Sequence, residues 1–148
     1  MSINLTYKHM NIQIQIIPHN EHRYETVGDW WLDDDGTLQV RVSKLSDSRY
    51  EALVVIHELV EVLIESVKRT GKLEIPQKLV EETDMFDKRY EYGRAADDEE
   101  SEPGCEPDCP VYQGHMAASA IENIVAMLLN VNYNDYADEI AAQVQDEP

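Results

Sequence analysis

Basic side chains, cysteines and long apolar runs are all scarce in this chain of 148 residues. It holds 12 Lys and Arg against 30 Asp and Glu, which gives a formal net charge of -18. Contacts to phosphate groups need clustered lysines and arginines, so this balance argues against direct binding to nucleic acid and to anionic membranes. Densely apolar stretches such as residues 53–56 and 59–64 are far shorter than the ~18 uninterrupted apolar residues of a membrane-spanning helix. We therefore expect neither a nucleic-acid-binding protein nor a membrane protein.

The cysteines and the first residues bear on the cellular compartment. Two cysteines, Cys105 and Cys109, are too few for a disulfide framework, and we expect both to be free thiols. Residues 1–15 lack the apolar segment of a secretion signal. These features predict a protein of the cytoplasm, either of the producing cell or of a host cell.

The first third of the chain has the pattern of a small sheet. Apolar residues make up 43% of the chain, enough for a packed core, and the length is typical of one domain. Apolar and polar residues alternate over residues 10–17 and 37–42, and residues 27–32 favour a further strand. Asp35 and Gly36, between the last two segments, are a strong hairpin signal. We expect an antiparallel sheet.

Four helices are predicted after the sheet, over about residues 50–68, 76–92, 114–130 and 133–144. The first is apolar around most of its circumference, so we expect it to be the central helix. An acidic loop that contains prolines is expected at about residues 94–110. The predicted fold is α+β: a single domain over residues 1–148, with a small antiparallel N-terminal sheet packed on a bundle of three to four helices.

The third predicted helix is also rich in apolar side chains. Such a composition predicts that most of them are buried. The residues concerned are Ala117, Ala118, Ala120, Ile121, Ile124, Val125, Met127 and Leu128.

Three polar residues interrupt the apolar run of the first helix: His57, Glu58 and Glu61. Residues four apart share a helix face, so His57 and Glu61 can point at one centre, while Glu58 is turned away by ~100°. Burying an imidazole and two carboxylates without partners would cost several kcal/mol. We therefore expect other groups to meet them.

The third helix offers a matching polar stripe. His115, Ser119 and Glu122 are spaced four and then three residues apart, which puts them on one face of an otherwise apolar helix. Packing the two polar faces together would gather four candidate metal ligands: His57, Glu61, His115 and Glu122.

Two imidazoles and a carboxylate are the ligand set of a catalytic zinc site, whose fourth position is left for water. Glu58 would stand beside that water as the general base. The third ligand is either His115 or Glu122, and Glu122 can instead orient a histidine. The alternative for the whole group is a buried network of ion pairs without a metal.

The segment His57, Glu58, Leu59, Val60 and Glu61 resembles the H-E-x-x-H helix of zincin metallopeptidases, with Glu61 in place of the second histidine. The order of a small sheet and a buried H-E-x-x helix is similar to minimal zincins of the ImmA/IrrE type, over about residues 10–68. The resemblance implies a zincin-like fold, His57 as the first ligand and Glu58 as the catalytic base. His115 would then replace the missing imidazole.

The zincin resemblance implies that the protein is a zinc-dependent hydrolase of the peptidase type, which acts on a protein or peptide. A catalytically inactive zincin scaffold is the other possibility. A magnesium site is a further alternative, because Glu58 and Glu61 with Glu81 and Asp84 resemble the carboxylates of all-α nucleotide pyrophosphohydrolases of the MazG type. The strands at the start of the chain do not fit that family.

A second resemblance covers most of the chain. The H-E-L-V-E segment, followed by E-P-G at residues 102–104, P-V-Y at 110–112, H-M-A at 115–117 and I-E at 121–122, looks like small, uncharacterised phage and prophage proteins. It suggests an alternative function, a non-enzymatic acidic inhibitor that imitates DNA and binds a basic host partner. The carboxylates that would contribute are Asp97, Asp98, Glu99, Glu100 and Glu102.

Overall fold

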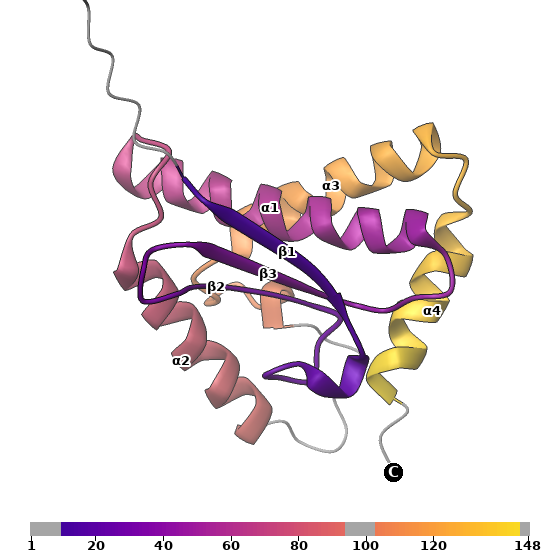
Figure 1. The fold of residues 1–148 in the computed structure, drawn as a ribbon, viewed down its shortest axis with the longest axis horizontal. Coiled ribbons are helices and arrows are strands. Elements are labelled where there is room, and N and C mark those ends of the chain that lie inside the picture. Colours follow the sequence, from indigo (N-terminus) through magenta and orange to yellow (C-terminus); the bar gives the residue numbers. More distant parts are fainter. Residues whose placement is uncertain (1–9, 94–102, 146–148) are drawn as a thin grey trace, which may run out of the picture.

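The computed structural model describes residues 10–93 and 103–145, and in this part of the chain the fold is α+β (Figure 1). Every predicted strand and helix is present, with bounds within two residues of those expected. The strands are β1 (Ile12–Ile17), β2 (Gly28–Leu32) and β3 (Leu38–Ser43), and the helices are α1 (Ser48–Thr70), α2 (Gln77–Gly93), α3 (Tyr112–Leu128) and α4 (Tyr133–Gln145). Two short 3-10 helices, η1 (His19–Glu21) and η2 (Pro103–Cys105), lie in the connections.

The sheet is mixed, so the prediction of an antiparallel sheet is right for one strand pair and wrong for the other. β2 and β3 form the expected antiparallel hairpin, whose turn is closed by the N–H of Gly36 donating to the carbonyl of Asp33 at 2.9 Å. β3 inserts between β2 and β1 and runs parallel to β1. The alternating pattern identifies a strand but not its neighbour in the sheet. Residues 18–27 carry the chain past the position that β3 later occupies, so β1 and β2 do not pair with each other.

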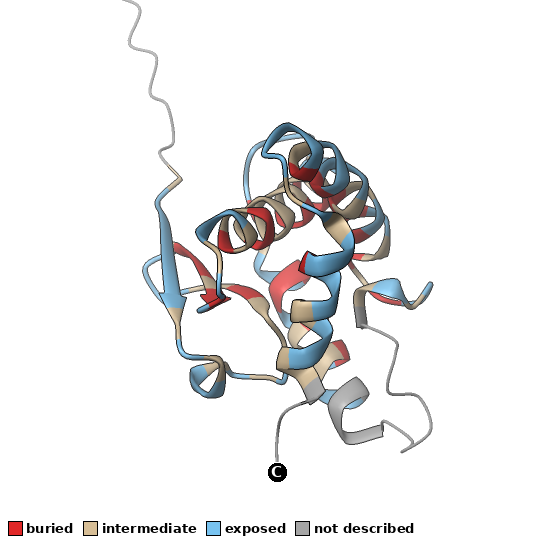
Figure 2. Cartoon of the chain, turned by 90° about the vertical axis from the view of Figure 1, so that its right-hand side faces the viewer, coloured by how far each residue is buried: buried red, intermediate tan, exposed pale blue. Residues whose placement is uncertain are grey.

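α1 lies between the sheet and α3, as Figure 1 and Figure 2 show from two sides. Leu38 and Val40 of β3 are fully buried, and so are Leu53 and Val62 of α1. Trp30 on β2 is the register partner of Val40 and belongs to the same core. The central position predicted for α1 is therefore confirmed.

Several apolar residues expected to be buried lie at the surface instead. The outward side of α1 is only half-buried, and Val67 is exposed. On α3, which packs mainly on α1, the side away from α1 is open among the described residues. Its exposed members from the predicted buried set are Ala120, Ile121, Ile124, Met127 and Leu128.

α1 and α3 run antiparallel and cross closely at Gly114. A Cβ atom at this position would lie 2.7 Å from the backbone oxygen of Glu61, so a larger residue would push the helices apart. The N–H of Gly114 donates to the carboxylate of Glu65 at 2.7 Å. This close contact brings the polar stripes of the two helices together. Among the helices in the described ranges, none combines the length and the hydrophobicity that a membrane span requires.

Candidate metal centre

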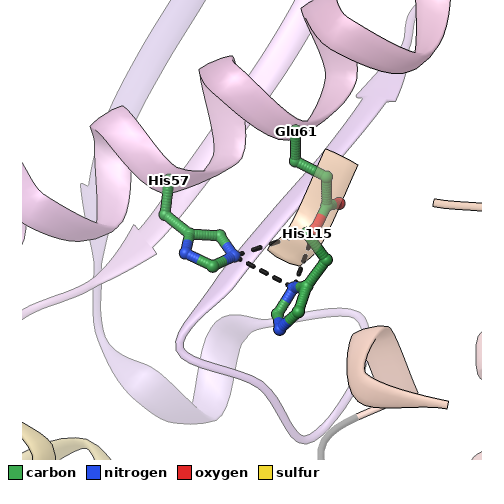
Figure 3. A group of neighbouring side chains, drawn as sticks. All are labelled: His57, Glu61 and His115. Atoms are coloured by element: carbon green, nitrogen blue, oxygen red, sulfur yellow. Dashed lines mark hydrogen bonds and ion pairs between the residues drawn. The ribbon is translucent and has the colours of Figure 1, made fainter. Parts of the chain in front are cut away.

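Two histidines and a glutamate from α1 and α3 point at one another (Figure 3). His57 Nε2 lies 3.0 Å from His115 Nδ1, and Glu61 Oε2 lies 2.9 Å from that same Nδ1 and 3.7 Å from His57 Nε2. The side chains of His57, Glu61 and His115 are 12%, 8% and 9% exposed. The structure therefore gathers three of the four ligands proposed from the sequence.

The spacing of these three atoms suits a tetrahedral ion. Zinc–nitrogen and zinc–oxygen bonds of ~2.0–2.1 Å place neighbouring ligand atoms of a tetrahedron roughly 3.3–3.4 Å apart. The three observed separations, 2.9, 3.0 and 3.7 Å, bracket this value. His57 Nε2, Glu61 Oε2 and His115 Nδ1, called here the ligand triangle, thus have the size of one face of a zinc coordination tetrahedron.

Glu122, the fourth proposed ligand, lies on the other side of His57. Its Oε2 is 2.8 Å from His57 Nδ1, so it contacts the ring nitrogen that faces away from the ligand triangle. The hydroxyl of Tyr133 donates to Oε1 of Glu122 at 3.2 Å. This arrangement favours the orienting role over the ligand role, because a carboxylate at Nδ1 fixes the ring with Nε2 toward Glu61 and His115.

Glu58, the proposed base, lies beside the ligand triangle against strand β2. A Cβ atom on Gly28 would come within 2.2 Å of Glu58 Oε1, so the carboxylate occupies the space that the side chain of a larger residue at position 28 would need. The negative charge of Glu58 contributes to the electrostatic field at His57. Ser119, the remaining member of the α3 stripe, donates its hydroxyl to the backbone oxygen of His115 at 3.0 Å.

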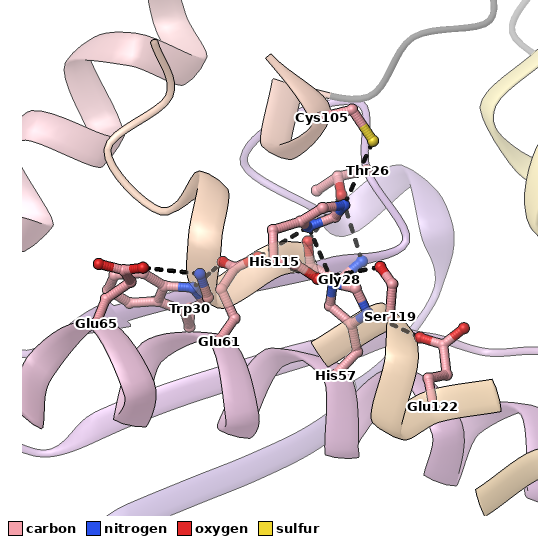
Figure 4. A network of polar contacts seen from close by, with 11 residues as sticks. Thr26, Gly28, Trp30, His57, Glu61, Glu65, Cys105, His115, Ser119 and Glu122 are labelled. Carbon is pink, nitrogen blue, oxygen red and sulfur yellow. Dashed lines mark hydrogen bonds and ion pairs between the residues drawn. The ribbon is translucent and has the colours of Figure 1, made fainter. Parts of the chain in front are cut away.

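Three further residues support the site and were not singled out as site residues from the sequence; Figure 4 labels two of them, Trp30 and Cys105. Trp30 donates its indole N–H to Glu61 Oε1 at 3.0 Å. Cys105 Sγ lies 3.6 Å from His115 Nε2, the ring nitrogen outside the ligand triangle. Gly104 packs on the ring of His115, where a Cβ atom would lie 2.4 Å from Nδ1. The sequence around Gly104 and Cys105 signals only a loop, so these contacts carry no recognisable pattern.

The ionisation of the site reflects an excess of carboxylates. Burial disfavours the charged form of His57, but Glu122, Glu61 and the charge of Glu58 outweigh it and raise the pKa of His57 to about 11. Burial also opposes ionisation of Glu61, yet His115, His57 and the indole of Trp30 lower the pKa of that carboxyl to about 2. The site therefore favours positive charge at its centre, as a cation-binding site must.

Negative charge extends from the ligand triangle toward α2. Burial raises the pKa of Asp87 to about 7, and the charges of Asp29, Glu61 and Asp84 act in the same direction. Burial is the larger cause of this shift, and the three neighbouring carboxylates add to it. This environment disfavours anionic ligands and favours cations.

The other candidate residues have separate positions. Cys105 and Cys109 are not joined in a disulfide, in line with the prediction, and the first is exposed and the second buried. Of the carboxylates in the magnesium alternative, Glu81 is exposed on α2 and Asp84 pairs with Arg23 at 3.4 Å. The acidic residues proposed to imitate DNA, Asp97 to Glu100 and Glu102, lie outside the described residues, and that function stays a prediction.

Comparison with known proteins adds no relative. The chain matches no protein-family model, no curated protein and no solved structure. The resemblance to zincins therefore rests on the H-E-x-x-E segment and the order of elements.

Proposed function

We propose that this protein binds one zinc ion in the ligand triangle and is a zincin-like, zinc-dependent hydrolase. The observation that supports this proposal is the ligand triangle itself, three buried donor atoms at separations of 2.9, 3.0 and 3.7 Å. Two imidazoles and one carboxylate are the donor set of catalytic zinc sites, which keep a fourth position open.

Each residue of the site has a distinct part in this proposal. His57, Glu61 and His115 hold the ion, and Glu122 orients His57 from the opposite ring nitrogen. When bound, zinc lowers the pKa of a water molecule and polarises a carbonyl oxygen. Glu58 is the base that accepts the proton from water, since it is the remaining carboxylate beside His57.

The substrate we propose is a protein or peptide. This follows the zincin resemblance, with one departure: a carboxylate stands where zincins have their second histidine, and the second imidazole comes from α3. The anionic surroundings of the site favour a neutral or basic peptide over an acidic one.

The test is cleavage of a mixed peptide library by the zinc-loaded protein, followed by mass spectrometry. Glu58→Gln keeps the shape of the side chain but removes the base, and we expect cleavage to fall by at least ~100-fold with zinc still bound. Glu81→Gln, a change at an exposed carboxylate of α2, is the matched control and should cleave like the wild type. Equal cleavage by wild type and Glu58→Gln would contradict the proposed role of Glu58.

A further inference from the structure

The carboxylate that orients His57 is itself held from its other side. Glu122 is buried, and its two oxygens have different partners. Oε2 lies 2.8 Å from His57 Nδ1, whereas Oε1 accepts a hydrogen bond from the hydroxyl of Tyr133 at 3.2 Å. Both oxygens of this buried carboxylate are therefore bonded, one toward the metal centre and one toward α4.

Tyr133, Glu122 and His57 form a continuous path of polar contacts to the ligand triangle. Figure 4 shows its inner part, where Glu122 lies beside His57, whose Nε2 is 3.0 Å from His115 Nδ1. The terminal torsion of a glutamate is broad, so a carboxylate bonded through one oxygen alone can rotate. The hydroxyl of Tyr133 restricts this rotation, because it fixes the second oxygen while the first contacts Nδ1.

The position of Tyr133 is set by the tight turn between α3 and α4. The N–H of Val131 donates to the carbonyl of Ala126 at 2.9 Å, and Asn130 has a positive φ of 51°. The chain reverses at this turn, and α4 begins at Tyr133. The hydroxyl thereby reaches Glu122, which is eleven residues earlier in the sequence.

The ring of Tyr133 is held by aromatic packing that links α4 to α1. Its centroid lies 5.6 Å from that of Tyr136, which is 4% exposed, and Tyr136 lies 5.3 Å from Tyr50 in the first turn of α1. Figure 1 shows α4 beside this end of α1. Phenylalanine at position 133 keeps the ring and its packing and removes only the hydroxyl, so the hydroxyl can be tested by itself.

We infer that Tyr133 is a positioning residue of the metal centre, which holds Glu122 and, through it, His57. The inference rests on the zinc binding proposed above, but not on hydrolase activity or on the role of Glu58. It makes α4 part of the site, although α4 supplies no ligand. Partners of this kind strengthen metal binding because they keep the ligand ring in its bound orientation before the ion arrives.

The first experiment measures the zinc affinity of the full chain by competition with a chromogenic chelator. We expect Tyr133→Phe to raise the Kd about 3- to 10-fold, less than the about 10- to 100-fold expected for loss of a direct partner of a ligand. Tyr50→Phe is the matched control, because it removes a hydroxyl from the same aromatic cluster and keeps the ring that contacts Tyr136. Its Kd should equal that of the wild type, and circular dichroism verifies that both variants are folded.

A double-mutant cycle separates positioning from a general effect on the fold. If the hydroxyl acts through Glu122, Tyr133→Phe should change the Kd by less than about 2-fold when Glu122→Ala is already present. The same fold-change in both backgrounds would show that the hydroxyl acts independently of Glu122, and would overturn the inference.

Cobalt gives a second measurement that reports on the geometry of the site. Co²⁺ takes the place of zinc, and its visible absorption depends on the arrangement of its ligands. We expect Tyr133→Phe to change this spectrum, because His57 is less firmly oriented, and Tyr50→Phe to leave it unchanged. Wild-type Kd and spectrum in Tyr133→Phe would overturn the inference and leave the zinc site intact. A wild type that binds neither zinc nor cobalt would overturn the zinc site, and the role of Tyr133 with it.

Discussion

His57 and Glu122 contact each other across α1 and α3, with 2.8 Å between Nδ1 and Oε2. The contact leaves the other ring nitrogen of His57 directed at Glu61 and His115. A histidine that binds a metal through one nitrogen usually has its second nitrogen held by a carboxylate or carbonyl in this way. The contact with Glu122 therefore fixes the orientation of His57, and substitution of Glu122 tests this role.

Glu122→Gln should weaken zinc binding without abolishing it. The amide keeps the size of the side chain but removes the negative charge at Nδ1, and losses of such partners cost about 10- to 100-fold in metal affinity. Competition with a chromogenic chelator measures the affinity. A complete loss of zinc, equal to that in His57→Ala, would show that Glu122 is itself a ligand. An unchanged affinity would contradict its orienting role.

Trp30→Phe should loosen the site by leaving Glu61 without its indole donor. The hydrogen bond to Glu61 Oε1 is buried, and loss of a bond to a charged group costs about 1.5–3 kcal/mol in the free energy of unfolding. Trp31→Phe is the matched control, because its indole bonds the exposed carboxylate of Asp33. Urea unfolding of both variants checks this prediction. Equal destabilisation by the two changes would argue against a special role for Trp30.

Binding of zinc should release protons. The pKa of His57 is raised to about 11 in the metal-free protein, so near pH 7 the ring is protonated and a metal must displace that proton. Calorimetric titration in buffers of different ionisation enthalpy gives the number of protons released. We expect about one or more per zinc ion and an affinity that increases with pH. Binding without proton release would contradict this assignment.

The free energy of unfolding should depend on pH through the ionisation of Asp87. Its pKa is about 7 in the folded protein against an ordinary value of 3.8, so the folded state binds more protons between about pH 4 and pH 7. The stabilising contribution of the protonated carboxyl is complete below pH 4 and is lost as the pH rises through 7. Asp87→Asn removes this loss.

Asp87→Asn should therefore be more stable than the wild type at pH 8, by roughly 1–3 kcal/mol, with the difference shrinking toward pH 4. Urea unfolding at the two pH values tests the prediction. Asp138→Asn, at an exposed position of α4, should show no such trend. A difference between Asp87→Asn and wild type that does not vary with pH would contradict the account.

The elements of the fold were predictable from local pattern, but their pairing was not. Alternation over two residues and helical spacing over three to four residues are properties of neighbouring residues, so all strands and helices are found within two residues of their expected bounds. The parallel pairing of β1 with β3 depends on how residues 18–27 travel, and nothing in those residues specifies it.

The candidate site likewise contains residues that were predictable from local spacing and residues that were not. His57 and Glu61 share a helix face by their spacing, and the stripe that holds His115 and Glu122 matched it, so these residues were predictable. Trp30 and Cys105 reach the site from a strand and a loop whose positions depend on tertiary packing. The exposure of Ile124 and Met127 was missed because an apolar helix predicts burial, whereas the two side chains are exposed in the described part of the chain.

The central claim, a zinc site shared by α1 and α3, is tested most directly by the metal content of the untagged protein purified without chelators. Mass spectrometry of the metals should find about one zinc ion per chain in the wild type and none in His57→Ala or in His115→Ala. The absence of any stoichiometric metal in the wild type would contradict the claim. The ligand triangle would then be a buried network of hydrogen bonds and ion pairs.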